Sequence, residues 1–211
     1  MYQSALQGYQ GGMHAESEFE SATLGEQTWR YHDSGEGRPV ILIHGVPDTP
    51  QSWAGIARSL NQAGYRTIAP YLRGYHPDTL VAGRPYDALH VAEDVIGLLD
   101  ALELESAVLV GHDWGATVVY GAAALAPDRV QAIVPIAVAH PRTLKPKNAL
   151  QAAGMFVMAR HFIYFQLPWA EAGTRRGDFR YVDRLYRRWA PGWEGPERDA
   201  AVARAREAFS T

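Results

Sequence analysis

The chain has 211 residues, of which 47% are hydrophobic and 20% charged, and its net charge is -3. This is the balance of a soluble globular protein, and it gives no reason to expect nucleic acid or a membrane surface as a partner. The sequence contains no cysteine, which excludes disulfides, thiolate metal sites and cysteine nucleophiles. No run reaches the roughly 18 apolar residues of a membrane span, so a cytoplasmic location is the default expectation.

The first residues predict little structure, and the strands begin after them. Residues 1–15 are rich in Gln, Gly and Ser, which predicts a disordered lead-in. Alternating apolar positions predict a first strand over 16–24 and a second over Thr28–His32. The continuous apolar run Val40–Ile43 predicts a strand covered on both faces, and it ends in His44-Gly45-Val46-Pro47.

Strands and helices then alternate along the chain. The sequence predicts helices over 53–60, 87–102 and 117–126, and strands over 66–69, 107–110 and 130–139. Such alternation is typical of an α/β fold with a doubly wound, mostly parallel sheet, and ligands bind at the carboxyl ends of its strands. His44, Arg73, Asp113 and His140 all fall at those ends.

A glycine-bracketed aspartate follows the strand over 107–110. Asp113 stands between Gly111 and Gly115, where a strand turns sharply into a helix, so close packing there leaves no room for a Cβ. This pattern is the nucleophile elbow, with aspartate in the position of the usual serine. The alternative interpretation is an ordinary turn in which Asp113 merely caps the next helix.

The character of the sequence changes at Pro141. Apolar stripes predict helices over 182–189 and 196–209, and no strand pattern returns. We therefore expect a core over residues 16–140 and a helical cap, incomplete, over 141–211.

Four motifs together resemble the α/β-hydrolase superfamily, and within it the epoxide hydrolase branch, which uses an aspartate nucleophile. They are His44-Gly45-Val46-Pro47, Arg73-Gly74-Tyr75, Gly111-His112-Asp113-Trp114-Gly115, and the run from His161 to Pro168. The paired first and third motifs are shared with haloalkane dehalogenases. The resemblance implies an α/β-hydrolase core with a helical cap over the site.

The resemblance also implies roles for particular residues. Asp113 would be the nucleophile, and the main-chain N-H groups of Val46 and Trp114 would form the oxyanion hole. No metal or organic cofactor is implied, and the substrate would be a small apolar epoxide or, alternatively, a halide. The residues that support these motifs are His44, Gly45, Pro47, Gly111, His112 and Gly115.

Three details favour an epoxide over a carbon-halogen bond. Val46 offers no side-chain donor where one group of dehalogenases carries Asn, and the end of the 130–139 strand has no carboxylate to serve as triad acid. The arginines that hold a carboxylate substrate in fluoroacetate dehalogenases are replaced by Trp114 and Thr117.

The sequence departs from the family at two places. His161 stands where the family has a cap tyrosine that protonates the ring oxygen; it would be the acid or a packing residue, and Tyr164 is a displaced donor or a packing residue. None of the eight histidines occupies the family's general-base position, with His140 as a remote alternative. We therefore expect the last core strands to be missing, as in a fragment or an inactive copy. Arg73 is expected to hold its loop through backbone carbonyls.

Overall fold

The computed structural model describes residues 19–143 and 145–210, so the predicted lead-in lies outside the described residues. The described chain forms two compact units, divided between Val138 and Ala139. The elements of the first are β1 (Glu20–Leu24), β2 (Gln27–Ser34), β3 (Arg38–Ile43), η2 (Pro50–Trp53), α2 (Ala54–Gln62), β4 (Tyr65–Pro70), η3 (Pro77–Thr79), α3 (Ala88–Ala101), β5 (Ala107–His112), α4 (Trp114–Leu125), η4 (Pro127–Arg129) and β6 (Val130–Ile136). Those of the second are η5 (Pro141–Thr143), α5 (Ala149–Phe165), α6 (Ala170–Trp189) and α7 (Pro196–Ser210).

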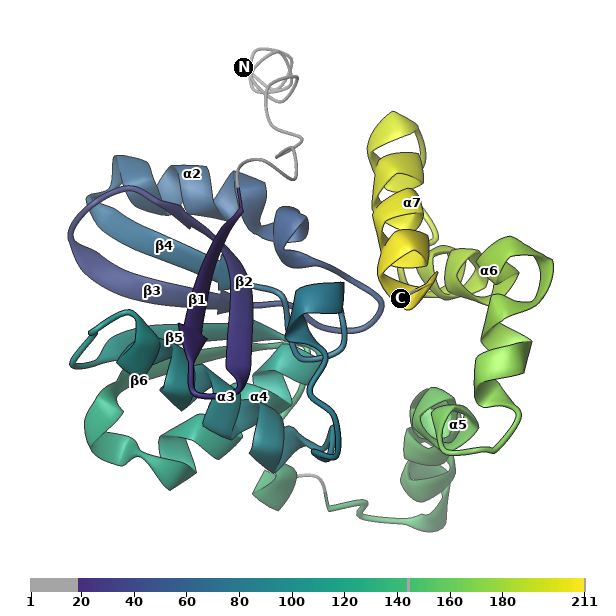
Figure 1. Cartoon of the computed structure of the whole chain (residues 1–211). Coiled ribbons are helices and arrows are strands. Elements are labelled where there is room, and N and C mark those ends of the chain that lie inside the picture. Colours follow the sequence, from purple (N-terminus) through teal and green to yellow (C-terminus); the bar gives the residue numbers. More distant parts are fainter. Residues whose placement is uncertain (1–18, 144, 211) are drawn as a thin grey trace, which may run out of the picture. The chain divides into compact units, whose positions relative to one another are not determined.

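The first unit is built on one six-stranded sheet with the order β1-β2-β4-β3-β5-β6 (Figure 1). The four neighbouring strands β4, β3, β5 and β6 are parallel. β2 pairs antiparallel with β4, and β1 pairs antiparallel with β2. The prediction of a mostly parallel α/β sheet is confirmed. Because β3 and β5 are neighbours, the loops after them meet at one edge of the sheet.

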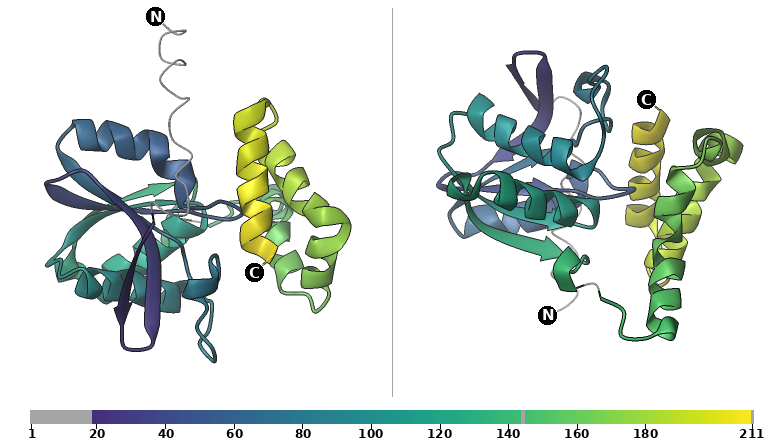
Figure 2. Two further views of the ribbon diagram at one scale, coloured as in Figure 1. Left: turned by 45° about the horizontal axis from the view of Figure 1, so that its top comes forward. Right: turned by 90° about the horizontal axis from the view of Figure 1, so that it is seen from below.

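The all-apolar strand β3 serves two cores, one on each face of the sheet. Ile41 and Ile43 pack toward α3 and α4, whereas Val40 and Leu42 pack toward α2. The helices accordingly cover opposite faces (Figure 2). All four side chains are buried, so the strand that carries His44 at its end is fixed by packing on both sides.

Several strand boundaries differ from the sequence prediction, and two of the differences have a clear structural reason. β2 continues through Asp33 and Ser34 because these residues pair with β4, and the Asp33 carboxylate accepts three hydrogen bonds from the Arg66 side chain. β6 ends at Ile136 and not at residue 139, since Ala137 has a φ of 69° that breaks the strand.

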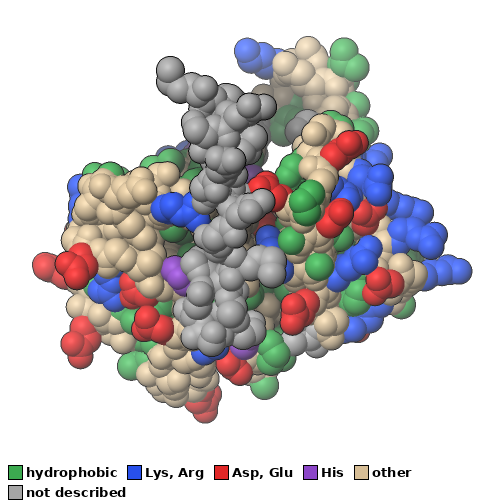
Figure 3. All heavy atoms as spheres, turned by 90° about the horizontal axis from the view of Figure 1, so that it is seen from above, with side chains coloured by type: hydrophobic (Ala, Val, Ile, Leu, Met, Phe, Trp, Pro, Cys, Tyr) green, Lys and Arg blue, Asp and Glu red, His purple; other side chains and the backbone are tan. Residues whose placement is uncertain are grey.

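The second unit is helical and has a core of its own. Phe179, Val182 and Tyr186 of α6 pack against Ala201, Val202 and Ala205 of α7. The long helix α5 was not predicted from the sequence, because its apolar residues surround the helix and form no stripe. α6 carries several exposed arginines. Figure 3 shows one face of the molecule with Lys and Arg side chains in blue. No helix in the described part of the chain is long and apolar enough to cross a membrane.

Candidate active site

Asp113 occupies the turn between β5 and α4, with φ 52° and ψ -115°. A positive φ on a non-glycine residue is strained, and the surrounding structure must hold it in place. The Asp113 N-H donates to the Ile136 carbonyl oxygen at 3.1 Å, and the Asp113 carbonyl oxygen accepts from the Ala116 N-H at 3.0 Å. The alternative interpretation as a helix cap is not supported, because the Asp113 side chain makes no capping hydrogen bond.

Three glycines allow backbone segments to meet at this turn. A Cβ on Gly111 would lie 2.2 Å from the Gly115 carbonyl oxygen, and one on Gly115 would lie 2.2 Å from the Ile43 carbonyl oxygen. A Cβ on Gly45 would lie 2.5 Å from the Cβ of Asp113. Any side chain at these positions would push the strand ends apart, so the glycines set the distance between the 44–47 loop and Asp113.

The Val46 N-H points at the Asp113 side chain and donates to Oδ1 at 3.0 Å. One carboxylate oxygen is thereby engaged by the main chain. Trp114 is the first residue of α4, and the backbone N-H groups at a helix N-terminus favour negative charge. The Val46-Pro47 peptide bond is cis. The role of Trp114 as a second donor stays a prediction.

His44 is buried at the end of β3 and uses both ring nitrogens. Its Nε2 accepts from the Leu72 N-H at 3.1 Å, so the proton must be on Nδ1, which lies 3.1 Å from the Gly45 carbonyl oxygen and donates to it. Burial lowers the pKa of His44 to about 4, and the ring is therefore neutral near pH 7. His112, by contrast, ends β5 and pairs with Ile136 in the sheet.

Tyr75 is a residue to which the sequence analysis assigned no role, although it belongs to the Arg73-Gly74-Tyr75 motif. Its ring packs edge-on against His44 at a centroid distance of 4.8 Å. Burial, followed by the charges of Asp113 and Asp48, raises the pKa of Tyr75. The phenol is therefore a neutral group near Asp113.

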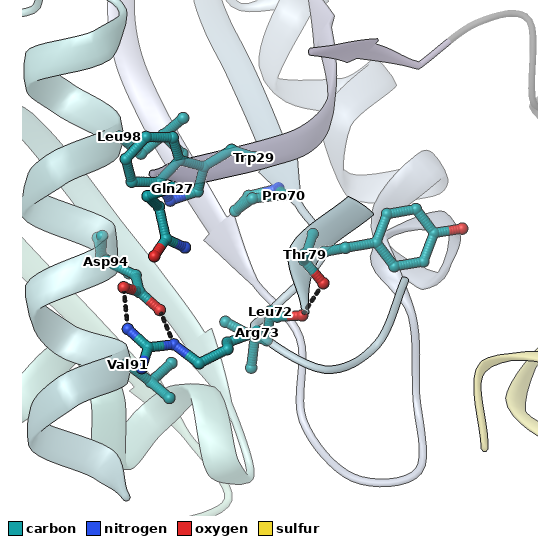
Figure 4. Close-up of a pocket in the computed structure, with 11 residues that line it drawn as sticks. Gln27, Trp29, Pro70, Leu72, Arg73, Thr79, Val91, Asp94 and Leu98 are labelled. Atoms are coloured by element: carbon teal, nitrogen blue, oxygen red, sulfur yellow. Dashed lines mark hydrogen bonds and ion pairs between the residues drawn. The ribbon is translucent and has the colours of Figure 1, made fainter. Parts of the chain in front are cut away.

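Arg73 is held by an acid from a neighbouring helix (Figure 4). Its Nε donates to Asp94 Oδ2 of α3 at 2.7 Å, and its Nη2 pairs with Oδ1 of the same carboxylate. Nη1 also donates to the Pro85 carbonyl oxygen at 2.9 Å and Nη2 to that of His90 at 3.4 Å, which confirms the predicted loop-pinning role. Asp94 was missed because it falls on the apolar stripe of its helix, where nothing in the sequence pairs it with Arg73.

A small cavity lies beside this ion pair, with Gln27, Trp29 and Leu98 among its lining residues (Figure 4). Its volume is about 10 Å³, which is room for about one water molecule. It is too small for an organic substrate.

The predicted cap residues belong to the second unit. The His161 ring packs against Phe162 at 4.3 Å and Trp189 at 5.0 Å. The Tyr164 hydroxyl donates to the Ala170 carbonyl oxygen at 3.3 Å, and its ring lies 4.5 Å from that of Tyr181. These contacts give both residues packing roles within their own unit, and the acid role of either one stays a prediction.

His140 lies at the start of the second unit, where its Nδ1 accepts from the Arg142 N-H at 3.2 Å. Within residues 19–143 and 145–210, no group of three or more His, Asp or Glu side chains could hold a metal ion.

Comparison with known proteins agrees with the fold. The family model described as the alpha/beta hydrolase fold matches residues 38–188. An epoxide hydrolase of Caballeronia sordidicola is 47% identical over 107 residues, covering 50% of this chain and 32% of the relative. Epoxide hydrolase A of Mycobacterium tuberculosis is 36% identical over 182 residues, covering 83% of this chain and 55% of the relative.

Among solved structures, a Klebsiella pneumoniae protein provisionally named an epoxide hydrolase superposes with a TM-score of 0.77 at 33% identity. The match covers 93% of this chain and 66% of that structure.

A mostly parallel sheet with helices on both faces and a strained aspartate at a strand-to-helix turn define an α/β hydrolase, and the chain belongs to the α/β-hydrolase fold family. Within that family it falls in the epoxide hydrolase-like branch. It spans about a third to about half of the length of the two curated relatives described above.

Proposed function

We propose that the protein is a hydrolase that opens epoxides to diols through a covalent ester on Asp113. The observation that carries the proposal is the hydrogen bond from the Val46 N-H to Asp113 Oδ1. It leaves Oδ2 as the attacking atom and places a backbone donor on the oxygen that must later bear negative charge. A carboxylate is ionised near neutral pH and so needs no base to attack a saturated carbon.

In the first step, Asp113 Oδ2 forms a bond to a ring carbon of the epoxide while the carbon-oxygen bond of the ring breaks. The electron pair goes to the ring oxygen, which takes a proton from an acid that we assign to His161 or Tyr164. The product is an alkyl ester of Asp113.

In the second step, water adds to the Asp113 carbonyl carbon and loses one proton to the solvent, and Oδ1 becomes an oxyanion held by the N-H groups of Val46 and Trp114. Each such donor contributes about 3 to 4 kcal/mol of transition-state stabilisation in other enzymes. Collapse of this intermediate breaks the ester bond, and the leaving oxygen takes the remaining proton of the added water. This releases the diol and restores the Asp113 carboxylate, while the acid of the first step regains its proton from the solvent. None of the residues assigned above is a base for the attacking water, so we expect the ester in this chain to hydrolyse slowly.

Incubation with styrene oxide followed by intact mass analysis tests the proposal. We expect a mass increase of one epoxide per chain, located on Asp113 by peptide mapping. The Asp113→Asn variant should form no adduct, because the amide keeps the shape of the side chain and removes the nucleophilic charge. Asp128→Asn, which alters an exposed carboxylate on η4, is the matched control and should react like the wild type.

Two other functions predict different results in the same assay. A haloalkane dehalogenase with the same nucleophile would release halide from a bromoalkane and would be alkylated by it, while the epoxide would leave no adduct. An inactive domain would form no adduct with either compound.

A further inference from the structure

We propose that His44 and the buried Arg73–Asp94 ion pair form a positioning relay that holds the Val46 N-H on Asp113. The proposal rests on the proposed function for its catalytic meaning. None of the three side chains would contact the substrate, and each acts through the next.

The relay ends on a single peptide group. The carbonyl oxygen of Gly45 and the N-H of Val46 belong to the same planar peptide, so fixing one end fixes the direction of the other. The oxygen accepts from His44 Nδ1 at 3.1 Å and from the Asp48 N-H at 2.9 Å. The N-H at the other end donates to Asp113 Oδ1 at 3.0 Å. His44 therefore fixes the direction in which the Val46 N-H points.

His44 is in turn held by the loop that follows β4. The Leu72 N-H donates to Nε2, which fixes the tautomer, and the rings of Tyr71 and Tyr75 lie edge-on at 6.5 and 4.8 Å. Donor and acceptor alternate from Leu72 through His44 and the peptide to Asp113. In such a chain each hydrogen bond polarises the next.

The loop itself is anchored at adjacent residues. The Leu72 carbonyl oxygen accepts from Thr79 Oγ1 at 3.2 Å and from the Tyr75 N-H at 3.0 Å. The next residue, Arg73, is clamped to Asp94 by two hydrogen bonds, and its side chain is buried (Figure 4). Helix α3 thus fixes the main chain from which the Leu72 N-H projects.

The test compares two ion pairs of similar geometry in the same unit. Asp94→Asn breaks the relay at its anchor. Asp33→Asn breaks the Arg66–Asp33 pair between β2 and β4, which has a two-point geometry but no link to His44. A double variant, Arg73→Met with Asp94→Leu, removes the anchor without leaving a buried charge unpaired.

The first readout is amide hydrogen exchange, which needs no enzymatic activity. In the Asp94→Asn and double variants, the Val46 amide should exchange about tenfold faster relative to the core amides of β3, since only the local opening is affected. In Asp33→Asn that ratio should stay at the wild-type value. An unchanged ratio in the Asp94 variants, or an equal rise in Asp33→Asn, would overturn the relay.

The second readout is the rate of adduct formation on Asp113 with styrene oxide. We expect a rate at saturating epoxide about three or more times lower in the Asp94 variants, with the half-saturating concentration unchanged, because orientation and not binding is impaired. A higher half-saturating concentration at an unchanged rate would contradict positioning. If the wild type forms no adduct, the proposed function fails, while the exchange experiment still decides the relay.

Discussion

His44 packs against the rings of Tyr71 and Tyr75, and both of its ring nitrogens make hydrogen bonds. Protonation would place a hydrogen on Nε2, directly opposite the Leu72 N-H that now donates to it. The groups that face the ring are the phenols of Tyr71 and Tyr75, which offer no negative charge at neutral pH. The folded state therefore resists protonation of this residue.

Stability should consequently fall in mildly acidic solution. The pKa of His44 is about 4 in the folded protein and about 6.5 in an unfolded chain. Between these values the unfolded state binds the extra proton, so stability is full above pH 6.5 and declines as the pH falls toward 4. The free energy of unfolding should fall by about 3 kcal/mol as the pH is lowered through this range. Urea unfolding at several pH values, followed by tryptophan fluorescence, measures the decline.

An NMR titration of the His44 ring provides the independent check on that prediction. Its carbon-bound protons should keep the shifts of the neutral form down to pH 5. A midpoint near the ordinary histidine value would contradict the buried, acceptor role of Nε2.

At the level of residues, the strand-to-helix turn could be predicted from the sequence, because two glycines that flank one residue at a spacing of two positions are typical of such a turn. Asp113, Gly111 and Gly115 could be placed by pattern alone. The Arg73–Asp94 pair could not, since the two residues are 21 positions apart and their meeting depends on how α3 packs on the sheet. His44 was expected to serve a structural role, but its partner Leu72 donates through the main chain, which leaves no trace in the sequence.

Helix α3 illustrates how an element couples packing to the site. Its inner face places Val91, Val95 and Leu98 in the core of the first unit, and Asp94 stands on the same face. The packing of these apolar residues determines where the Asp94 carboxylate meets Arg73. The stability of the helix is thus part of the relay.

Leu98 has no exposed surface, so truncating its side chain should lower the stability of the folded protein. Leu98→Ala should lower the free energy of unfolding by about 2 to 5 kcal/mol, the usual range for a buried leucine. Leu89→Ala on the same helix removes the same atoms from a side chain that is 56% exposed, and it should change stability by less than about 0.5 kcal/mol. Equal losses in chemical denaturation would mean that α3 does not pack as described.

The helices of the second unit show where element prediction fails. The stripe over 182–189 predicted the second half of α6 correctly, but α6 also contains three consecutive residues with positive φ, Gly177, Asp178 and Phe179. Only the first of these is a glycine, so the sequence gives no warning of the kink. The 17-residue helix α5 was not predicted, because its apolar residues do not lie along one face.

At the scale of the whole described sheet, its two edges differ. β6 pairs only with β5 in the described part of the chain, and it exposes Val134 and Ile136, which are 46% and 37% accessible. An apolar edge strand is a template for pairing with another molecule. The opposite edge, β1, is short and carries a single exposed large apolar residue, Leu24.

We expect this chain to self-associate through β6. Val134→Lys should weaken that association about tenfold, because burial of one valine contributes about 1.5 kcal/mol. Leu24→Lys places the same charge on the other edge and should leave association unchanged. Sedimentation velocity over a range of protein concentrations measures both variants, and equal effects would show that general charge repulsion is responsible.

The order of strands and helices in the first unit could be predicted from the sequence, because each strand is either apolar throughout or bounded by turn residues. The relation between Asp113 and the proposed acid could not be predicted, since the two belong to different units, each with its own core. His161 and Tyr164 were matched to the family by motif, and a motif carries no information about the distance to Asp113.

The donor aimed at Asp113 belongs to the main chain, and this has a practical consequence for engineering. Side chains at positions 46 and 114 can be exchanged while the amides that would face the developing charge remain. Mutant libraries directed at these two positions could therefore change which substrates fit, while the main-chain N-H groups that stabilise negative charge stay in place.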